Sequence, residues 1–310
     1  MTDNLPNPIV NIGDLPGLSE PANTLIKKVS KAFGGFFKPW QIRRVAKAEA
    51  DASVIKAKAE GEVAIIKAQT QIQITDYERN AMHRLVYEEA QRQKNMEDIA
   101  MRAISHLSEN ADPSKMDDDW VINYFDKARI ISDSEMQELW SRILAGEAND
   151  PGSYSKRTVN ALGDIDKNDA EIFMRLCCFC CTIDKYIVPL VFDIKDDIYV
   201  SNKVNFMSLS HLESIGLIKY GSFGGFKETN LPKRFSINYY GEQRNLTMKK
   251  DSDNELNVGE VLLTRVGEEL APICGSHPID GFIGYIESRW ARKKESGIPL
   301  FPSSDFESLT

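Results

Sequence analysis

The stretch of sequence that decides the fold reads ISDSEMQELWSRILAGEAN over residues 131–149, YSKRT over 154–158 and DKNDAE over 166–171. Its first piece repeats apolar side chains at intervals of three and four residues, which is the spacing of one helix face. Pro151-Gly152 separates the first two pieces and favours a turn. Asp166 stands where an N-cap would close the first turn of another helix. The stretch therefore predicts capped helices around a short turn.

Residues 111–185 are predicted to form a helical core domain around this stretch. Asp117-Asp118-Asp119 precedes a helix with a large apolar face that includes Trp120 and Tyr124. The acidic run has two interpretations, an N-terminal turn stabilised by the helix dipole or a divalent-cation site. The absence of calcium-loop spacing favours the turn. Further helices are expected over residues 134–145, 155–162 and 167–181.

Residues 41–110 are predicted to form one long helix, because proline is absent and Ala, Glu, Lys, Gln and Arg dominate. Two ladders of apolar residues repeat every 11 residues, or ~3.67 residues per turn, which suits a nearly straight helix. The ladders lie three residues apart and form one stripe. An isolated helix cannot bury such a stripe, so we predict a homo-oligomer. The candidate oligomerisation residues are Ile55, Val63, Ile66, Ile74, Tyr77, Leu85 and Met96.

Residues 21–40 are predicted to form a basic amphipathic helix after a disordered N-terminus over residues 1–20. Pro21 suits the first turn of a helix, and lysines flank an apolar face. Two interpretations stay open. The face docks on an anionic membrane, with aromatic residues as interfacial anchors, or it packs on a partner subunit. The residues of this candidate contact are Lys27, Lys28, Lys31, Phe33, Phe36, Phe37 and Trp40.

Residues 186–294 are predicted to form a winged-helix-like α+β module, followed by a mobile tail over 295–310. The expected elements are strands over 186–192, 198–200 and 261–264, a hairpin over 234–240 and 244–250, and helices over 208–215, 266–273 and 278–294. The fold class expected for the whole chain is mainly α with a small β component. It comprises a long N-terminal helix, a helical core and the C-terminal module.

The predicted hairpin carries a basic cluster that suits phosphate contacts. Its residues are Lys233, Arg234, Arg244, Lys249 and Lys250. A basic wing of this kind would make the chain a nucleic-acid-binding regulator. The helix over 208–216 contains no Lys or Arg, however, and residues 111–310 hold 32 acidic against 23 basic residues. A solvated hairpin is therefore the preferred interpretation, and nucleic acid is the less favoured partner.

Four of the five cysteines crowd into residues 177–181, and the fifth is Cys274. They would bind a metal if Cys274 or His277 completed the ligand set. Apolar neighbours favour the alternative, in which the cysteines pack as small buried hydrophobes. The four histidines are isolated in the sequence, and no phosphate loop or nucleophile elbow is present. We expect no catalytic residue, metal ligand or cofactor, and predict that the chain is not an enzyme.

The sequence contains neither a secretory signal nor an apolar run of membrane-spanning length. The crowded cysteines do not form a disulfide framework and are typical of reduced thiols. These features predict a cytoplasmic protein, peripheral to the inner membrane if the N-terminal helix docks there.

Several pieces of the chain, spread from about Leu15 to Trp290, carry a family likeness. They are Lys38-Pro39, Arg43-Arg44-Val45-Ala46-Lys47-Ala48-Glu49-Ala50, Asp119-Trp120, Ser132-Asp133 through Asn149, Tyr154-Ser155-Lys156-Arg157-Thr158 and Pro272-Ile273-Cys274-Gly275. With these pieces the chain resembles the bacterial family catalogued as domain of unknown function 2806. That resemblance implies a domain and a lineage without a reaction.

The helical core and residues 216–264 are similar, more loosely, to the abortive-infection alpha proteins of phage defence. This likeness implies a role in bacterial immunity. The Ala/Glu/Lys-rich helix is also similar in texture to the stalks of prohibitin and flotillin relatives, although no membrane-anchored head of that kind precedes it. None of these families supplies catalytic residues.

The function expected from these observations is that of a non-enzymatic, self-associating protein. The long helix would assemble subunits, and the acidic C-terminal part would contact a phage or host protein. The resemblance implies an anti-phage setting. The alternatives are a nucleic-acid-binding regulator that uses the basic wing and an enzyme whose site the sequence does not reveal.

Overall fold

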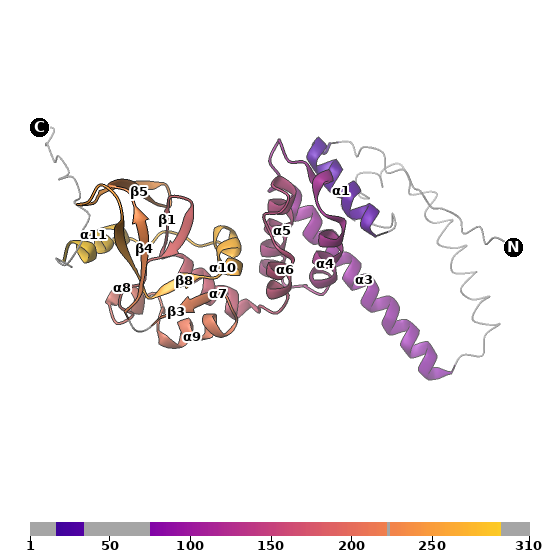
Figure 1. Cartoon of the computed structure of the whole chain (residues 1–310). Helices are drawn as coiled ribbons and strands as arrows, with labels where there is room; N and C mark the ends of the chain where they lie inside the picture. The colour runs from indigo at the N-terminus through magenta and orange to yellow at the C-terminus, as the bar shows by residue number, and fades with distance from the viewer. Residues whose placement is uncertain (1–16, 34–74, 222–223, 293–310) are drawn as a thin grey trace, which may run out of the picture. The chain divides into compact units, whose positions relative to one another are not determined.

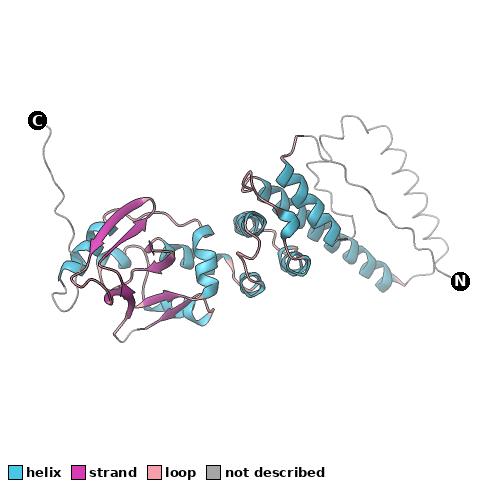
Figure 2. Ribbon diagram, turned by 45° about the horizontal axis from the view of Figure 1, so that its top comes forward, coloured by secondary structure: helices cyan, strands magenta, loops and turns pink. Residues whose placement is uncertain are grey.

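The computed structural model of the chain describes residues 17–33, 75–221 and 224–292, and it divides between Gly163 and Asp164 into two units. Figures 1 and 2 show helices in unit 1 and a mixture of helices and strands in unit 2. The coarse prediction of a helical core followed by an α+β part is confirmed. Residues 1–16 of the disordered N-terminus predicted over 1–20, the first part of the long helix over 41–74 and the predicted tail over 295–310 lie outside the described residues. The prediction of disorder is wrong at Ser19 and Glu20, which are the N-cap and the first residue of a helix.

Unit 1 is built from helices that pack around an aromatic centre. The described elements are α1 (Glu20–Ala32), α3 (Asp76–Ile104), the 3₁₀ turn η1 (Pro113–Lys115), α4 (Asp118–Ala128), α5 (Ser134–Asn149) and α6 (Lys156–Gly163). Helix α3 packs on α5, α4 packs on α6, and α1 lies against η1 and α4. At the centre, the Tyr124 hydroxyl donates to the Trp140 carbonyl at 2.6 Å, and both side chains are fully buried. The predicted apolar faces of these helices therefore meet in one core.

Helix α3 begins at Asp76, so the predicted uninterrupted helix over 41–110 is wrong at Thr75. The Thr75 backbone is extended there, with φ −64° and ψ 160°. Its side chain accepts from the Glu78 N–H, and the Glu78 carboxylate accepts from the Thr75 N–H at 2.7 Å. This capping box satisfies backbone donors that the first turn of a helix leaves without partners.

Unit 2 alternates short helices with short strands. Its helices are α7 (Lys167–Cys177), α8 (Asp197–Val200), α9 (Phe206–Ser214), α10 (Arg265–Leu270) and α11 (Phe282–Arg292), with the 3₁₀ turn η2 (Ala271–Ile273). Its strands are β1 (Cys180–Ile183), β2 (Tyr186–Pro189), β3 (Ile218–Tyr220), β4 (Phe226–Leu231), β5 (Arg234–Tyr239), β6 (Glu242–Thr247), β7 (Asn254–Gly259) and β8 (Val261–Leu263).

The strands of the described residues pair in antiparallel fashion as β2-β1-β5-β6, β3-β8 and β4-β7. The predicted hairpin is confirmed as β5–β6, and in register Phe235 faces Leu246 and Ile237 faces Arg244. Its strand β5 extends the β1–β2 pair, while β3, which follows α9, pairs with β8. This arrangement does not establish the predicted winged helix.

Two further element predictions are corrected in unit 2. The helix expected over 167–181 ends at Cys177, because Cys180 enters β1 and pairs with Pro189. The segment 198–200, which was expected to be a strand, belongs to the short helix α8. Asp197 is an acidic residue in the first turn of α8, where the helix dipole favours a negative charge. Helix α7 also belongs to unit 2, so the predicted core domain over 111–185 divides at Gly163.

Candidate functional site

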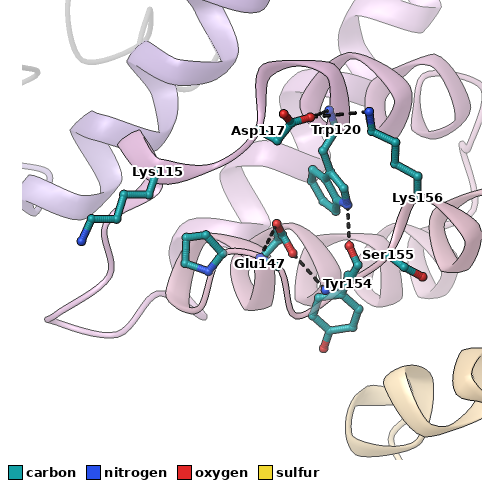
Figure 3. A pocket seen from close by; sticks show the side chains of 9 residues that line it. Lys115, Asp117, Trp120, Glu147, Tyr154, Ser155 and Lys156 are labelled. Carbon is teal, nitrogen blue, oxygen red and sulfur yellow. Dashed lines mark hydrogen bonds and ion pairs between the residues drawn. The ribbon is translucent and has the colours of Figure 1, made fainter.

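A cleft of about 470 Å³ lies in unit 1, where α4 begins and the chain turns from α5 into α6 (Figure 3). It is lined by side chains from three of the pieces that carry the family likeness. Asp117 and Trp120 come from the start of α4, Glu147 from the last turn of α5, and Tyr154 and Lys156 from the turn and the start of α6. Residues 30–40 positions apart in the sequence therefore meet at one place.

Glu147 anchors the turn beside the cleft. The side chain is only 2% exposed. One of its oxygens accepts from the Gly152 N–H at 2.8 Å, and the other accepts from the Tyr154 N–H at 3.0 Å. The carboxylate thus satisfies two backbone donors that the turn would otherwise leave unpaired. An acidic residue in the last turn of a helix opposes the helix dipole, and this misfit is the sequence clue to a special role for Glu147.

The Trp120 side chain connects the start of α4 to the turn between α5 and α6 by a hydrogen bond. Its indole N–H donates to the Tyr154 carbonyl at 2.7 Å. Its own backbone N–H donates to the Asp117 carboxylate, also at 2.7 Å, and Asp117 is the N-cap of α4. The interpretation of the acidic run as an N-terminal helix turn is therefore confirmed.

The lysines of the cleft already have acidic partners. The Lys156 ammonium lies 3.5 Å from the Asp117 carboxylate and 4.0 Å from that of Asp119. The Lys115 ammonium lies 3.1 Å from the Asp112 carboxylate. These pairs balance the positive charge that an anionic ligand would require. The geometry is that of a junction at which α4, α5 and α6 are held together.

Replacing Gly146 by alanine is expected to cost ~1–3 kcal/mol of unfolding free energy, because the new methyl group overpacks the core. A Cβ at Gly146 would lie 2.5 Å from Cε2 of the Tyr154 ring, which is itself buried. Urea unfolding followed by tryptophan fluorescence measures the change. Gly163→Ala is the matched control, since its Cβ would meet only the Lys127 side chain at 3.5 Å. Equal stabilities for the two variants would contradict the expected crowding.

The first half of α3 carries the second candidate feature, an exposed apolar surface. Figure 1 shows this half of the helix running beyond α4 and α5. Two residues of the predicted oligomerisation ladders lie here, Tyr77 at 89% and Leu85 at 59% exposed. Met82, Val86 and Tyr87 are exposed as well. Large side chains of this kind gathered on one helix are typical of an interaction surface.

Met96 does not belong to that surface, which corrects its assignment to oligomerisation. It is 5% exposed on the part of α3 that packs in unit 1. The second half of α3 thus belongs to the core of unit 1, whereas its first half projects from that core. Ile55, Val63, Ile66 and Ile74 lie outside the described residues.

The predicted membrane-docking face of α1 is covered by unit 1 itself. Leu25, Ile26 and Val29 are fully buried, and the Phe33 ring meets that of Phe125 edge-on at 5.5 Å. The apolar side chains within α1 are therefore already covered, while contact of the whole segment over 21–40 with a membrane or a partner subunit stays a prediction. Of the flanking lysines, Lys28 pairs with Asp118 at 2.6 Å, Lys27 also has an interaction partner and Lys31 is exposed. Phe36, Phe37 and Trp40 lie outside the described residues.

The basic cluster of the β5–β6 hairpin is partly neutralised by carboxylates. Lys233 pairs with Asp251 at 2.7 Å. Arg244 pairs with Glu242 and lies 3.3 Å from Glu287 of α11. The remaining cluster residues are Arg234, Lys249 and Lys250, all exposed. The structure therefore offers phosphate less free charge here than the sequence suggested.

Residues that look isolated in the sequence find partners in the fold. His106 contacts Glu138, His211 contacts Asp169, and the His277 Nδ1 lies 3.1 Å from the Cys178 sulfur. The Cys274 sulfur donates to the Ala271 carbonyl at 3.2 Å. Of the two residues considered as further metal ligands, Cys274 and His277, the structure places His277 beside Cys178. Among the described residues, no group of three or more such side chains is arranged to hold a metal ion.

These features define a protein with a helical unit, one helix of which carries exposed apolar side chains, followed by an α+β unit that holds five free cysteines. The model of a protein family of unknown function (DUF2806) matches residues 78–287, more than half of the chain, and the chain belongs to that family. No curated protein and no solved structure matches it. Within the described ranges, no helix combines the length and the hydropathy that crossing a membrane requires.

Proposed function

We propose that this protein is a non-enzymatic, self-associating factor whose subunits join through the first half of α3. The main support for self-association is the set of large apolar side chains that stay exposed on this half of α3, including Tyr77 and Leu85. Exposing such residues on a projecting helix costs solvation free energy. A partner helix that covers them recovers ~1.5–3 kcal/mol for each large side chain.

The charges on this helix favour a second copy as the occupant. Glu78, Leu85 and Arg92 are seven residues apart, about two turns, and therefore share one face. In an antiparallel pair of copies centred on Leu85, Glu78 of each copy would face Arg92 of the other. The helix is therefore self-complementary in charge as well as in apolar surface.

Leu85→Glu is expected to weaken self-association at least ~100-fold, because the pair loses an apolar contact and gains facing carboxylates. Sedimentation equilibrium of the full-length protein measures the dissociation constant. Ile122→Glu is the matched control, since Ile122 is also an exposed large apolar residue of unit 1 but lies on α4. A monomeric wild-type protein, or equal weakening by both variants, would refute the proposed interface.

Charge reversal tests the antiparallel geometry separately. Arg92→Glu is expected to weaken association about 3–10-fold, and the double variant that adds Glu78→Gln to recover part of the loss, because exposed ion pairs contribute ~1 kcal/mol and glutamine keeps the capping box of Thr75. Failure of the double variant to recover affinity would exclude this register.

The biological setting that we propose is defence against phage, with a phage or host protein as the further partner. Its support is the loose likeness to abortive-infection alpha proteins. The efficiency of plating of a phage panel on cells that produce the wild type or Leu85→Glu tests this setting. Equal plating on both strains and on cells that lack the protein would count against it.

A further inference from the structure

The outer strand of the β5–β6 hairpin, β6, has an open edge. The strand order of its sheet is β2-β1-β5-β6, so among the described strands β6 pairs on one side only. A two-residue turn with φ +48° and +90° joins β5 to β6, which makes Tyr239 and Glu242 on either side of it a hydrogen-bonded pair. At the other end of the hairpin, the Met248 N–H donates to the Lys233 carbonyl at 2.7 Å.

The backbone groups on the open edge of β6 follow from these two pairs. Hydrogen-bonded and non-hydrogen-bonded pairs alternate along an antiparallel ladder. Gln243, Asn245 and Thr247 therefore aim their N–H and C=O groups away from β5. Within the residues that the structure describes, none of these three N–H groups has an acceptor. A row of open backbone groups of this kind is a template for one more strand.

A cavity of about 490 Å³ lies beside the end of β6 that is nearest the hairpin turn. Glu242 and Arg244 of β6 line it, together with Glu287 of α11. Alternate side chains of a strand project on the same face, and the 3.3 Å between Arg244 Nε and Glu287 Oε1 shows that α11 covers this face. In a strand added to β6, every second side chain would project on this face as well. The one nearest the turn would reach the cavity.

The charges of the cavity suit a cationic side chain. The three carboxylates of Glu242, Asp280 and Glu287 outnumber the guanidinium of Arg244, which leaves two negative charges. Arg244 pairs with Glu242 and Glu287, whereas the exposed Asp280 has no ion-pair partner among the described residues. The amino end of α11 also borders the cavity, but its dipole adds only about half a positive charge and does not reverse this balance.

The aromatic lining of the cavity favours arginine among the cationic side chains. Tyr240 belongs to the lining and is 43% exposed. The face of a tyrosine ring attracts a guanidinium, which is planar and stacks on it. The same guanidinium can bind a carboxylate through two parallel hydrogen bonds. An arginine that enters the cavity thus finds both kinds of partner.

We propose that β6 binds an extended basic segment of a partner protein, which adds a strand to the sheet and places an arginine in this cavity. Hydrogen bonds to the open backbone of β6 supply the part of the affinity that does not depend on sequence, and the cavity selects the side chain. The excess of 32 acidic over 23 basic residues in 111–310 attracts a basic segment as well. The inference rests on the proposed function only in that a protein partner exists, since self-association was assigned to α3.

The test measures the fluorescence anisotropy of a labelled peptide with the full-length protein. The peptide alternates valine and threonine and carries one arginine near an end. One matched peptide has glutamate in place of the arginine, and another is N-methylated on the backbone nitrogens that would pair with β6. We expect saturable binding of the arginine peptide, about tenfold weaker binding of the glutamate peptide and loss of binding after N-methylation. Absence of saturable binding, or equal affinity for the three peptides, overturns the proposal.

A substitution in β6 tests strand addition from the side of the protein. Asn245→Pro removes one outward N–H and keeps the bonds to β5, because edge strands tolerate proline at such a position. It is expected to weaken binding of the arginine peptide at least about tenfold. Asn245→Ala, which keeps the N–H, is the matched control and should bind as the wild type does. If circular dichroism shows that Asn245→Pro is unfolded, the N-methylated peptide decides; wild-type affinity in the folded variant overturns the proposal.

A substitution in the cavity tests the arginine contact. Asp280→Asn is expected to weaken binding of the arginine peptide about threefold without weakening that of the glutamate peptide. Glu268→Gln is the control, since Glu268 is an exposed carboxylate of α10 outside the lining. Equal affinities of Asp280→Asn and Glu268→Gln for the arginine peptide overturn the proposal. Leu85→Glu should bind the peptide as the wild type does, so that failure of self-association and failure of this site remain distinguishable.

Discussion

Replacing Glu147 by alanine is expected to lower the free energy of unfolding of unit 1 by ~3–5 kcal/mol, because two charge-assisted hydrogen bonds are lost together. The buried carboxylate accepts from the backbone of Gly152 and Tyr154. Alanine leaves both N–H groups without an acceptor. The turn that they belong to also carries the Tyr154 carbonyl that holds the Trp120 indole. Loss of the carboxylate therefore loosens the start of α4 as well as the end of α5.

Hydrogen exchange followed by mass spectrometry measures this effect within the full-length chain, since peptides from α4 to α6 report on unit 1 alone. Glu147→Gln is expected to fall between the wild type and alanine, because its amide oxygen accepts one bond while its NH₂ group faces the other donor. Glu135→Ala, at the exposed start of the same helix, is the control and should cost less than ~1 kcal/mol. Equal protection of α5 in Glu147→Ala and the wild type would show that the turn does not depend on this carboxylate.

Local patterns predicted the helices of unit 1 well, since their apolar spacing, caps and breakers all lie within a few residues of one another. The same kind of pattern was also available where the prediction was wrong. Thr75 and Glu78 form the Ser/Thr-x-x-Glu capping signal, but the 11-residue ladder continues through them in register. Periodicity favoured a helix that runs through Thr75, whereas the capping box makes Thr75 the N-cap and starts α3 at Asp76.

The elements of unit 2 were harder to predict, because one continuous run of sequence can suit both a helix and a strand. The run from Phe173 to Cys181 suits a helix in composition, and the first part of it is one. Its end pairs instead with β2 across Asp184-Lys185, with Asp184 in a left-handed conformation at φ +54°. Aspartate tolerates the left-handed conformation that such a two-residue turn requires. The long-range pairing of β1 with β5 then adds hydrogen bonds that no local pattern reveals.

In the candidate sites, too, local features could be predicted from the sequence and long-range contacts could not. The ladder located the exposed half of α3, because helix periodicity reports which face is apolar; it could not reveal that Met96 is covered by its own chain. The contact between the Cys178 sulfur and the His277 ring joins residues about 100 positions apart, and such contacts are long-range. They depend on how η2 is placed against α7, which spacing alone does not encode.

Replacing Gly259 by alanine is expected to destabilise unit 2 by about 3–5 kcal/mol, since backbone strain and overpacking add at this position. Gly259 ends β7 with φ +100°, and a Cβ there would lie 2.1 Å from the Val191 carbonyl oxygen. Rotating a side chain cannot relieve this contact, because the obstacle is backbone. Moving that backbone would also break the bond from the Glu260 N–H to the same carbonyl, at 2.6 Å, and disturb the step from β7 to β8.

Hydrogen exchange of peptides from β3, β7 and β8 in the full-length chain measures the effect of Gly259→Ala. Gly284→Ala is the control, because Gly284 lies in α11 and an added Cβ would meet nothing within 4 Å. That control should stabilise the helix by ~0.5–1 kcal/mol, the ordinary gain from glycine to alanine in a helix interior. Unit 1 should keep its wild-type protection in both variants, since its core is its own. Wild-type protection of β7 and β8 in Gly259→Ala would mean that Val191 yields without cost, and that the close approach of these two backbones is not what holds the strands of unit 2 together.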